Sequence, residues 1–248
     1  MKLYITILFL NCSVFANDIY LGIPKEKYLM GDYSGSKVHK AFVNKSNGAT
    51  QLMRPDVAEA FQKMVDAFEK DKGNKTAETI WARSSFRSYY DQKAIWENKY
   101  SGKTKMKESV EGKKPEERVA LILQYSSAPG TSRHHWGTDI DINSFDNEYF
   151  AKGGKGEFLY QWMTTNAHKF GFCQPYNDLK DRNNQGYFLE RWHWSYAPIS
   201  NKLLADWLEL YQEKKIIIKG KFSGSETMPV EMPKTYVSSI NKTCANVR

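Results

Sequence analysis

The 248-residue sequence predicts one α+β domain, with a central antiparallel sheet flanked by helices. Segments with helical and strand periodicity are mixed, without the regular strand–helix alternation that builds a parallel sheet. No internal repeat and no linker divides the chain, and 41% hydrophobic residues are enough to form one core. We therefore expect a single domain.

Five segments have the pattern of helices. Pro55 opens the first, whose apolar residues recur at helical spacing until Gly73, a typical stop. Ser88 and Asp91 have the spacing of a capping box, so a second helix is expected to begin there. The other three are expected from Pro115 to Tyr125, over 157–169 with a stop at Gly171, and around 203–211.

Strands are expected over 78–83, 139–143, 172–176 and 187–196. The segment 139–143 (DIDIN) alternates polar and apolar residues, which predicts a half-buried strand. Residues 17–53 are mixed and loop-like and are expected to wrap the domain. The tail from Lys219 contains Ser, Thr and Pro and is expected to be loosely held.

The first residues have the pattern of a secretory signal peptide. A positive Lys2 precedes a mostly apolar run over 3–15, and small residues near Ala16 suit a cleavage site. The run is shorter than the roughly 20 residues of a membrane-spanning helix. We expect export to the periplasm or cell wall, with no membrane span once the signal is removed.

Two cysteines remain after that cleavage, Cys173 and Cys244. In an oxidising compartment they either pair or stay as a buried residue and a free thiol, and the sequence leaves both possibilities open. The net charge of +8 comes from scattered lysines without a nucleic-acid-binding motif, so no nucleic-acid partner is expected. The oligomeric state is not indicated.

Two segments are dense in polar side chains that a core would reject, 132–141 (SRHHWGTDID) and 190–193 (ERWH). A catalytic zinc takes three protein ligands and keeps a fourth position for water. Three side chains can converge on one such ion. His134 lies where a loop enters a strand, Asp141 lies on that strand, and His193 lies on a second strand. The pattern alone is moderately specific, because a His–Asp pair is more often structural.

Glu190 lies three residues before His193. On a regular strand these two side chains point to opposite faces, so a bend or bulge is needed to bring both to one metal. With such a bend, Glu190 can take a proton from a metal-bound water. The alternative is a surface carboxylate paired with Arg191.

Four ordered segments carry a family resemblance over roughly residues 54–196. They are S-x-H-x-x-G-x-x-x-D at 132–141, E-x-W-H at 190–193, SSFRSYYDQ at 84–92, and the G-F and G-Y pairs within 171–187. Together they resemble the D-Ala-D-Ala carboxypeptidase and dipeptidase family of zinc peptidases, which shares its fold with the hedgehog signalling domain. The resemblance implies a hedgehog/DD-peptidase-like fold with a single zinc cleft, one Zn²⁺ per chain, and peptidoglycan stem peptides as substrates.

The resemblance also implies roles for individual residues. His134, Asp141 and His193 match the zinc ligands, and Glu190 matches the general base. Arg87 matches the arginine that stabilises the polarised carbonyl or the developing oxyanion. Positions that contact polar groups of the substrate are matched by Ser132 and Gln92. The chain then divides into a signal peptide (1–16), an N-terminal wrapping segment (17–53), a zinc peptidase domain (54–215) and a C-terminal tail (216–248).

The sequence departs from the family pattern at several positions. Asp139 stands where the family usually has a small residue. Its carboxylate either holds a metal ligand or a substrate amine without binding the metal itself, or it faces solvent. Arg191 replaces a common proline. His135 and Trp136 are candidates for the cleft mouth, although packing is at least as good an explanation for Trp136.

Other functions fit the sequence less well. An S-x-x-K string at 34–37 lacks the partner motifs of a serine peptidase, and H-E-x-x-H is absent. A non-catalytic, zinc-stabilised wall-binding module would need the ligands but not Glu190 or Arg87. Within the peptidases, removal of a terminal D-Ala is the first choice, and L,D-carboxypeptidase and D,D-endopeptidase activities remain as alternatives.

Overall fold

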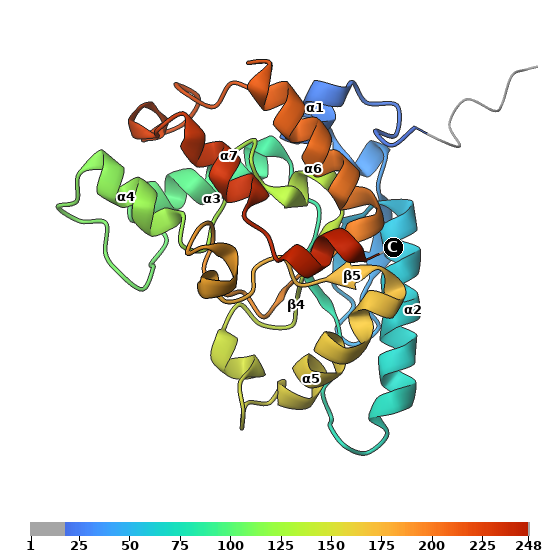
Figure 1. Cartoon of the computed structure of the whole chain (residues 1–248). Coiled ribbons are helices and arrows are strands. Elements are labelled where there is room, and N and C mark those ends of the chain that lie inside the picture. The colour runs from blue at the N-terminus through green and yellow to red at the C-terminus, as the bar shows by residue number, and fades with distance from the viewer. Residues whose placement is uncertain (1–17, 248) are drawn as a thin grey trace, which may run out of the picture.

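The computed structural model describes residues 18–247 (Figure 1). The expected signal peptide lies outside these residues. A four-stranded antiparallel sheet has the order β3 (Ala82–Ser84), β4 (Asp139–Ile142), β6 (His193–Tyr196) and β5 (Phe172–Cys173). A separate antiparallel hairpin joins β1 (Lys40–Val43) to β2 (Thr50–Met53). The α+β class with a central antiparallel sheet is confirmed.

Helices α2 (Pro55–Lys72) and α3 (Tyr89–Tyr100) begin where local signals predict. Pro55 occupies the first turn of α2, and Gly73 follows its last residue. Before α3, the Asp91 amide donates to the Ser88 hydroxyl at 3.2 Å while the Ser88 amide donates to the Asp91 carboxylate at 3.0 Å, which completes the capping box. The seven α-helices among the described residues are α1 (Lys25–Met30), α2 (Pro55–Lys72), α3 (Tyr89–Tyr100), α4 (Pro115–Ile122), α5 (Glu157–Asn166), α6 (Ala197–Gln212) and α7 (Glu231–Ser238).

The central sheet separates two hydrophobic cores. Helices α2 and α5 cover one face and bury Ile140, Ile142 and Trp194 of the sheet. Helices α1, α3, α4, α6 and α7 gather around the second core (Figure 1). Successive residues of a strand point to opposite faces, so the polar residues of β4 and β6 point away from the first core, toward the region between the two. The polar side chains on this face, Asp139, Asp141, His193 and Ser195, are nevertheless buried.

This burial corrects the expectation for β4, because all four of its residues are buried and not half of them. The strands are also shorter than the sequence suggested. β3 begins at Ala82, β5 ends at Cys173, and β6 starts only at His193. Residues 187–192, expected as strand, are irregular and end in a turn.

The two ends of the described chain contain more structure than expected. Within 18–53, helix α1 packs on α6 and the β1–β2 hairpin adds to the first core, so regular elements interrupt the expected loop. The tail is not loosely held either, since α7 packs against α6 and contributes the buried Val237 to the second core. A disulfide joins Cys173 on β5 to Cys244, which answers the question that the sequence left open. The domain boundaries drawn from the sequence stay predictions.

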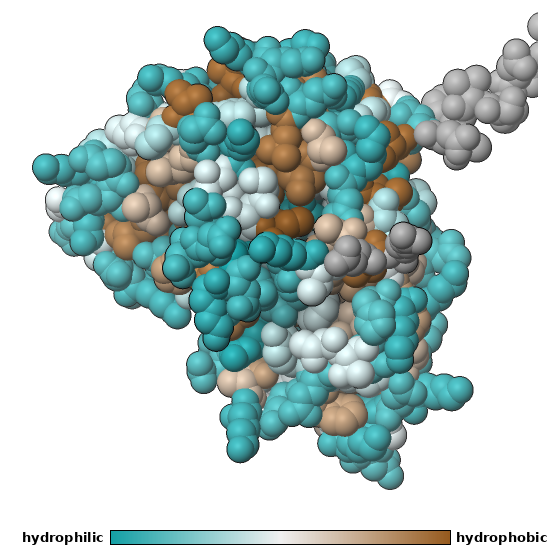
Figure 2. Space-filling model, viewed as in Figure 1, coloured by the Kyte–Doolittle hydropathy of each residue, from teal (hydrophilic) through white to brown (hydrophobic). Residues whose placement is uncertain are grey.

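The surface in Figure 2 is mainly hydrophilic, and its apolar residues lie in separate patches gathered in the upper half of the view. Within the described part of the chain, no helix combines the length and apolar character needed to cross a bilayer.

Candidate metal centre

Strand pairing brings the first two candidate ligands together. In the β4–β6 register, Asp141 lies directly opposite His193, and Asp139 lies directly opposite Ser195. Directly opposed residues on one face of an antiparallel pair have neighbouring side chains. As a result, Asp141 Oδ1 lies 3.0 Å from His193 Nδ1. Two residues 52 positions apart in the sequence meet because of this register.

His134 reaches the same point from the 3-10 helix η2 (Arg133–Trp136), which leads into β4. The Ser132 hydroxyl caps η2 by accepting from the His134 amide at 3.3 Å, and Gly137 ends it in the left-handed region at φ 68°. His134 Nδ1 lies 2.8 Å from the carbonyl oxygen of Ser85, just after β3. The ring is therefore oriented with Nε2 toward Asp141, 3.2 Å from its Oδ2.

These three side chains form a group suited to a cation. One ligand atom from each lies within 4.8 Å of the others, and all three residues are buried. His134 Nε2 and Asp141 Oδ1 have no hydrogen-bond partner among the described residues, although charged neighbours lie close. Buried polar atoms without partners are costly, and a bound cation would satisfy both. Two imidazoles and a carboxylate are a donor set that zinc accepts.

Asp139 forms a second layer behind His193. It is fully buried, and its Oδ2 lies 2.8 Å from His193 Nε2 and accepts from Arg133 Nε at 3.0 Å. Hydroxyls of Ser195 and Thr138 each donate to its Oδ1 at 2.8 Å. The solvent-facing alternative for Asp139 is wrong. Its contact with Nε2 leaves His193 Nδ1 facing Asp141, as a hydrogen-bonded ligand histidine requires.

Charge and burial act together on these groups. Burial alone would raise the pKa of Asp139, but the Arg133 guanidinium and His193 hold it well below its usual range. Burial also opposes the charged form of His193, yet its hydrogen bonds to Asp139 and Asp141 raise its pKa to about 9 in the metal-free site. Burial lowers the pKa of His134. The site is therefore strongly polarised before any cation enters.

Glu190 reaches this site through a turn. It precedes β6, and in the turn over Arg191 and Trp192 the His193 amide donates to the Glu190 carbonyl at 3.3 Å. The bend that the sequence required is present, and Glu190 Oε2 lies 3.5 Å from His193 Nδ1. Glu190 is 5% exposed, while Arg191 donates to the Asn147 carbonyl, so a surface Glu190–Arg191 pair is excluded. Burial raises the pKa of Glu190 to about 8 in the metal-free site.

Arg87 follows β3 and is held beside Asp141. Its guanidinium donates to Gln92 Oε1 at 2.9 Å and lies 3.5 Å from Asp141 Oδ2. Gln92 in turn donates to the Ser127 carbonyl at 2.7 Å. Gln92 and Ser132 are both buried, and neither lies on the wall of the cleft. Their contact with substrate stays a prediction, and in this structure they position Arg87 and η2.

His135 and Trp136 do not line the cleft mouth. Both are fully buried, with His135 Nδ1 2.7 Å from the Arg87 carbonyl and Trp136 Nε1 donating to the Leu29 carbonyl at 3.1 Å. Packing is the correct explanation for both residues. The local sequence could not decide this, because it does not show which way each side chain of η2 points, and only the fold places His134 at the metal centre and its two successors elsewhere.

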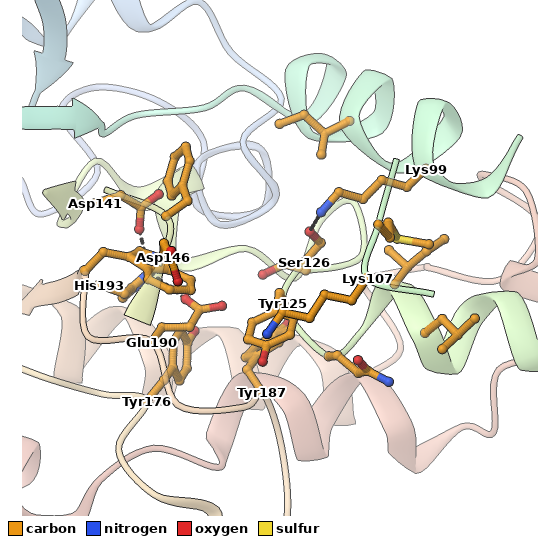
Figure 3. A pocket seen from close by; sticks show the side chains of 18 of the residues that line it. Lys99, Lys107, Tyr125, Ser126, Asp141, Asp146, Tyr176, Tyr187, Glu190 and His193 are labelled. Carbon is orange, nitrogen blue, oxygen red and sulfur yellow. Dashed lines mark hydrogen bonds and ion pairs between the residues drawn. The ribbon is translucent and has the colours of Figure 1, made fainter. Parts of the chain in front are cut away.

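A cleft of about 650 Å³ opens over the metal centre. Figure 3 shows Asp141, His193 and Glu190 on one side and Lys99, Lys107, Tyr125 and Ser126 on the other. The sequence reasoning missed this second group. For Lys99 a signal existed, because Gln92, Ile95 and Lys99 recur at the spacing of one helix face.

Known proteins resemble the region that contains this cleft. The family model described as VanY, D-alanyl-D-alanine carboxypeptidase, matches residues 50–199. YodJ of Bacillus subtilis strain 168, which carries a provisional carboxypeptidase name, is 33% identical over 154 residues, or 59% of this chain and 47% of that protein. A D-alanyl-D-alanine carboxypeptidase of Enterococcus faecalis strain V583 is 34% identical over 73 residues, or 29% of this chain and 25% of that protein.

The chain thus spans about half or less of these two relatives. Among solved structures, VanYB in complex with D-alanine-D-alanine is 21% identical, with a TM-score of 0.49, and the match covers 76% of this chain and 87% of that chain. The span matched by the family model includes the metal centre, Glu190 and Arg87.

Proposed function

The chain belongs to the D-alanyl-D-alanine carboxypeptidase family that the VanY model describes, and on this premise we propose that it is a zinc-dependent hydrolase of peptidoglycan stem peptides that removes a terminal D-Ala. One observation carries the proposal. Two imidazoles and a carboxylate converge within 4.8 Å in a cleft that also holds a buried glutamate and an arginine. A structural zinc site is closed by its ligands, whereas this one opens onto a cleft.

His134 Nε2, the Asp141 carboxylate and His193 Nδ1 are the atoms that would hold the ion. When bound there, Zn²⁺ supplies a Lewis acid for the scissile carbonyl and lowers the pKa of water toward ~7. The protein contributes the orientation of the ligands. Ser85 fixes the ring of His134, and Asp139 fixes that of His193.

Glu190 serves as the general base and then as the acid. Its carboxylate lies 3.5 Å from His193 Nδ1, so it is within reach of a water at the metal centre. Burial raises its affinity for a proton. In this role it takes the proton from the attacking water and returns it to the leaving amine.

Arg87 serves to stabilise the negative charge that develops on the carbonyl oxygen. Gln92 holds its guanidinium on one side, and Asp141 lies on another. A fixed cation in a partly enclosed cleft costs no reorganisation during the reaction, which is why such groups contribute strongly to transition-state stabilisation. The guanidinium is partly exposed, so a substrate can reach it.

The direct test is digestion of purified muropeptides, with the products analysed by mass. Loss of one Ala from a pentapeptide supports the proposal. Loss of Ala from a tetrapeptide selects the L,D-carboxypeptidase alternative, and separation of cross-linked dimers selects the D,D-endopeptidase. A chelator should abolish the activity and zinc should restore it. Zinc binding without hydrolysis of any stem peptide would support the wall-binding module instead.

We also infer that the protein works outside the cytoplasm, in the periplasm or at the cell wall. The Cys173–Cys244 disulfide supports this inference, because disulfides persist mainly in oxidising compartments. Processing after Ala16 remains a prediction, and N-terminal sequencing of the secreted protein tests it.

A further inference from the structure

Lys99 extends from helix α3 into the cleft, on the side away from the metal ligands. Ile95 and Lys99 lie one helical turn apart and both line the cleft. The Lys99 ammonium donates to the hydroxyl of Ser126, which follows α4. In Figure 3, Lys99 and Ser126 lie across the view from Asp141 and His193, and Glu190 points into the space between them.

Within the part of the chain that the structure describes, the Lys99 ammonium has no partner of opposite charge in direct contact. Among residues 18–247, its ammonium meets a neutral hydroxyl, and the carboxylate of Glu190 acts on it only through space. Lys93, on the same helix, behaves differently, because it is paired with Glu97 at 2.7 Å. Lys99 is partly withdrawn from water, and this burial lowers its pKa. Withdrawing a cation from water is costly unless an anion compensates it.

The charged side chains beside the metal centre are already engaged. Glu190 lies 3.5 Å from His193 Nδ1, and Arg87 is held by Gln92 beside Asp141. Lys107 is exposed and lies over the ring of Tyr125, with its nitrogen 5.3 Å from the ring centre. Lys99 and Ser126 therefore offer a cation and a hydroxyl side by side, facing open cleft volume. This combination suits a carboxylate, which accepts from both.

We propose that Lys99 and Ser126 form a subsite for a carboxylate of the bound peptide, separate from the metal centre. The inference deepens the proposed function and rests on it for the nature of the ligand. Two carboxylates of a stem peptide have the required chemistry. One is its C-terminal group, and the other belongs to an internal glutamate residue linked through its side chain.

The test measures binding without turnover. Zinc-loaded protein carrying Glu190→Gln is titrated calorimetrically with a synthetic pentapeptide, L-Ala-D-isoGlu-L-Lys-D-Ala-D-Ala. Adding Lys99→Met should weaken binding about ten- to a hundredfold, as expected for a lost charge-assisted hydrogen bond. Lys99→Arg, which keeps the cation, should bind within about threefold of the parent.

The matched control is Lys103→Met. Lys103 is exposed and lies outside the cleft wall, so this variant removes the same charge and should bind as the parent does. Zinc content and melting temperature are measured for each variant, and Ser126→Ala provides a second, smaller perturbation of the subsite. High salt should weaken binding by the parent more than binding by Lys99→Met.

Two amidated peptides identify the carboxylate. If amidation of the C-terminus removes the penalty of Lys99→Met, the terminal carboxylate occupies the subsite, and if amidation of the glutamate residue removes it, the internal one does. The proposal is overturned if Lys99→Met still weakens the binding of both amidated peptides. It is also overturned if folded Lys99→Met binds the unmodified peptide within about twofold of the parent protein. Failure of the proposed function is distinguishable, because the wild-type protein would then hydrolyse no stem peptide at all.

Discussion

Replacement of Asp139 by Asn perturbs the metal centre without touching a metal ligand. The carboxylate accepts from the Arg133 guanidinium and from the hydroxyls of Ser195 and Thr138, and it orients His193 through Nε2 at 2.8 Å. An amide keeps the shape, but it removes the charge and places an N–H group among donors. Loss of such a support typically weakens metal binding about 10- to 100-fold, which corresponds to roughly 1.4–2.7 kcal/mol.

The same substitution also leaves Arg133 buried without its counter-charge, since the side chains of Arg133 and Asp139 are 1% and 0% exposed. Breaking a buried ion pair costs about 3–5 kcal/mol of unfolding free energy. Adding Arg133→Met removes the unpaired cation, so the double variant should recover most of that stability. It should not recover the metal affinity, because the orientation of His193 still depends on the missing carboxylate.

Two measurements separate these effects. Competition with a coloured chelator gives the zinc dissociation constant, and urea unfolding of the metal-free protein gives the stability. Asp206→Asn is the matched control, because Asp206 is a buried aspartate paired with Lys202 in α6 and makes no contact with the metal centre. It should lose stability and keep its zinc affinity. Zinc binding by Asp139→Asn within about twofold of wild type would refute the assigned support of His193.

Three further predictions concern the base, the disulfide and a turn. Glu190→Gln should lower kcat on a stem pentapeptide at least about 100-fold and leave zinc content unchanged, and an active variant would remove Glu190 from the chemistry. Replacing Cys173 and Cys244 by Ser should reduce the unfolding free energy by about 2–5 kcal/mol, measured in urea, with reductant having no further effect on the variant. Gly137→Ala should destabilise the fold by about 1–3 kcal/mol, because φ is 68° and the added Cβ would lie 2.7 Å from His39; equal urea midpoints for variant and wild type would contradict that reasoning.

Much of the architecture was predictable because it depends on neighbouring residues. The capping box at Ser88, Pro55 in the first turn of α2 and the glycine after it are local features, and all are present in the structure. The alternation in β4 also assigned Asp139 and Asp141 to one face. The strand lengths could not be predicted, because a strand ends where its partner ends, and partners lie far apart in the sequence.

The site was predictable only in part. The ligand triad was found from residue types and family resemblance, whereas Lys99 and Ser126 were missed. Lysine and serine are common on surfaces. Helical spacing places Lys99 on one face with Gln92 and Ile95, but the sequence does not show that Ser126, from a distant segment, lies against that face. The sequence also did not show that Gln92 holds Arg87 by a hydrogen bond. That contact depends on how α3 packs against the loop at Ser127, whose carbonyl accepts from the Gln92 amide.

The sequence by itself determined which side chains can bind a cation and which residues share a face of a strand or helix, because both depend on chemistry and backbone period alone. The tertiary structure decided that Asp141 lies opposite His193 and that a turn brings Glu190 close to the Nδ1 atom of His193. It also decided that the residues of β4 are buried. These features depend on the register between strands. Register is selected by burying the apolar face of the sheet against α2 and α5, which is a property of the whole chain.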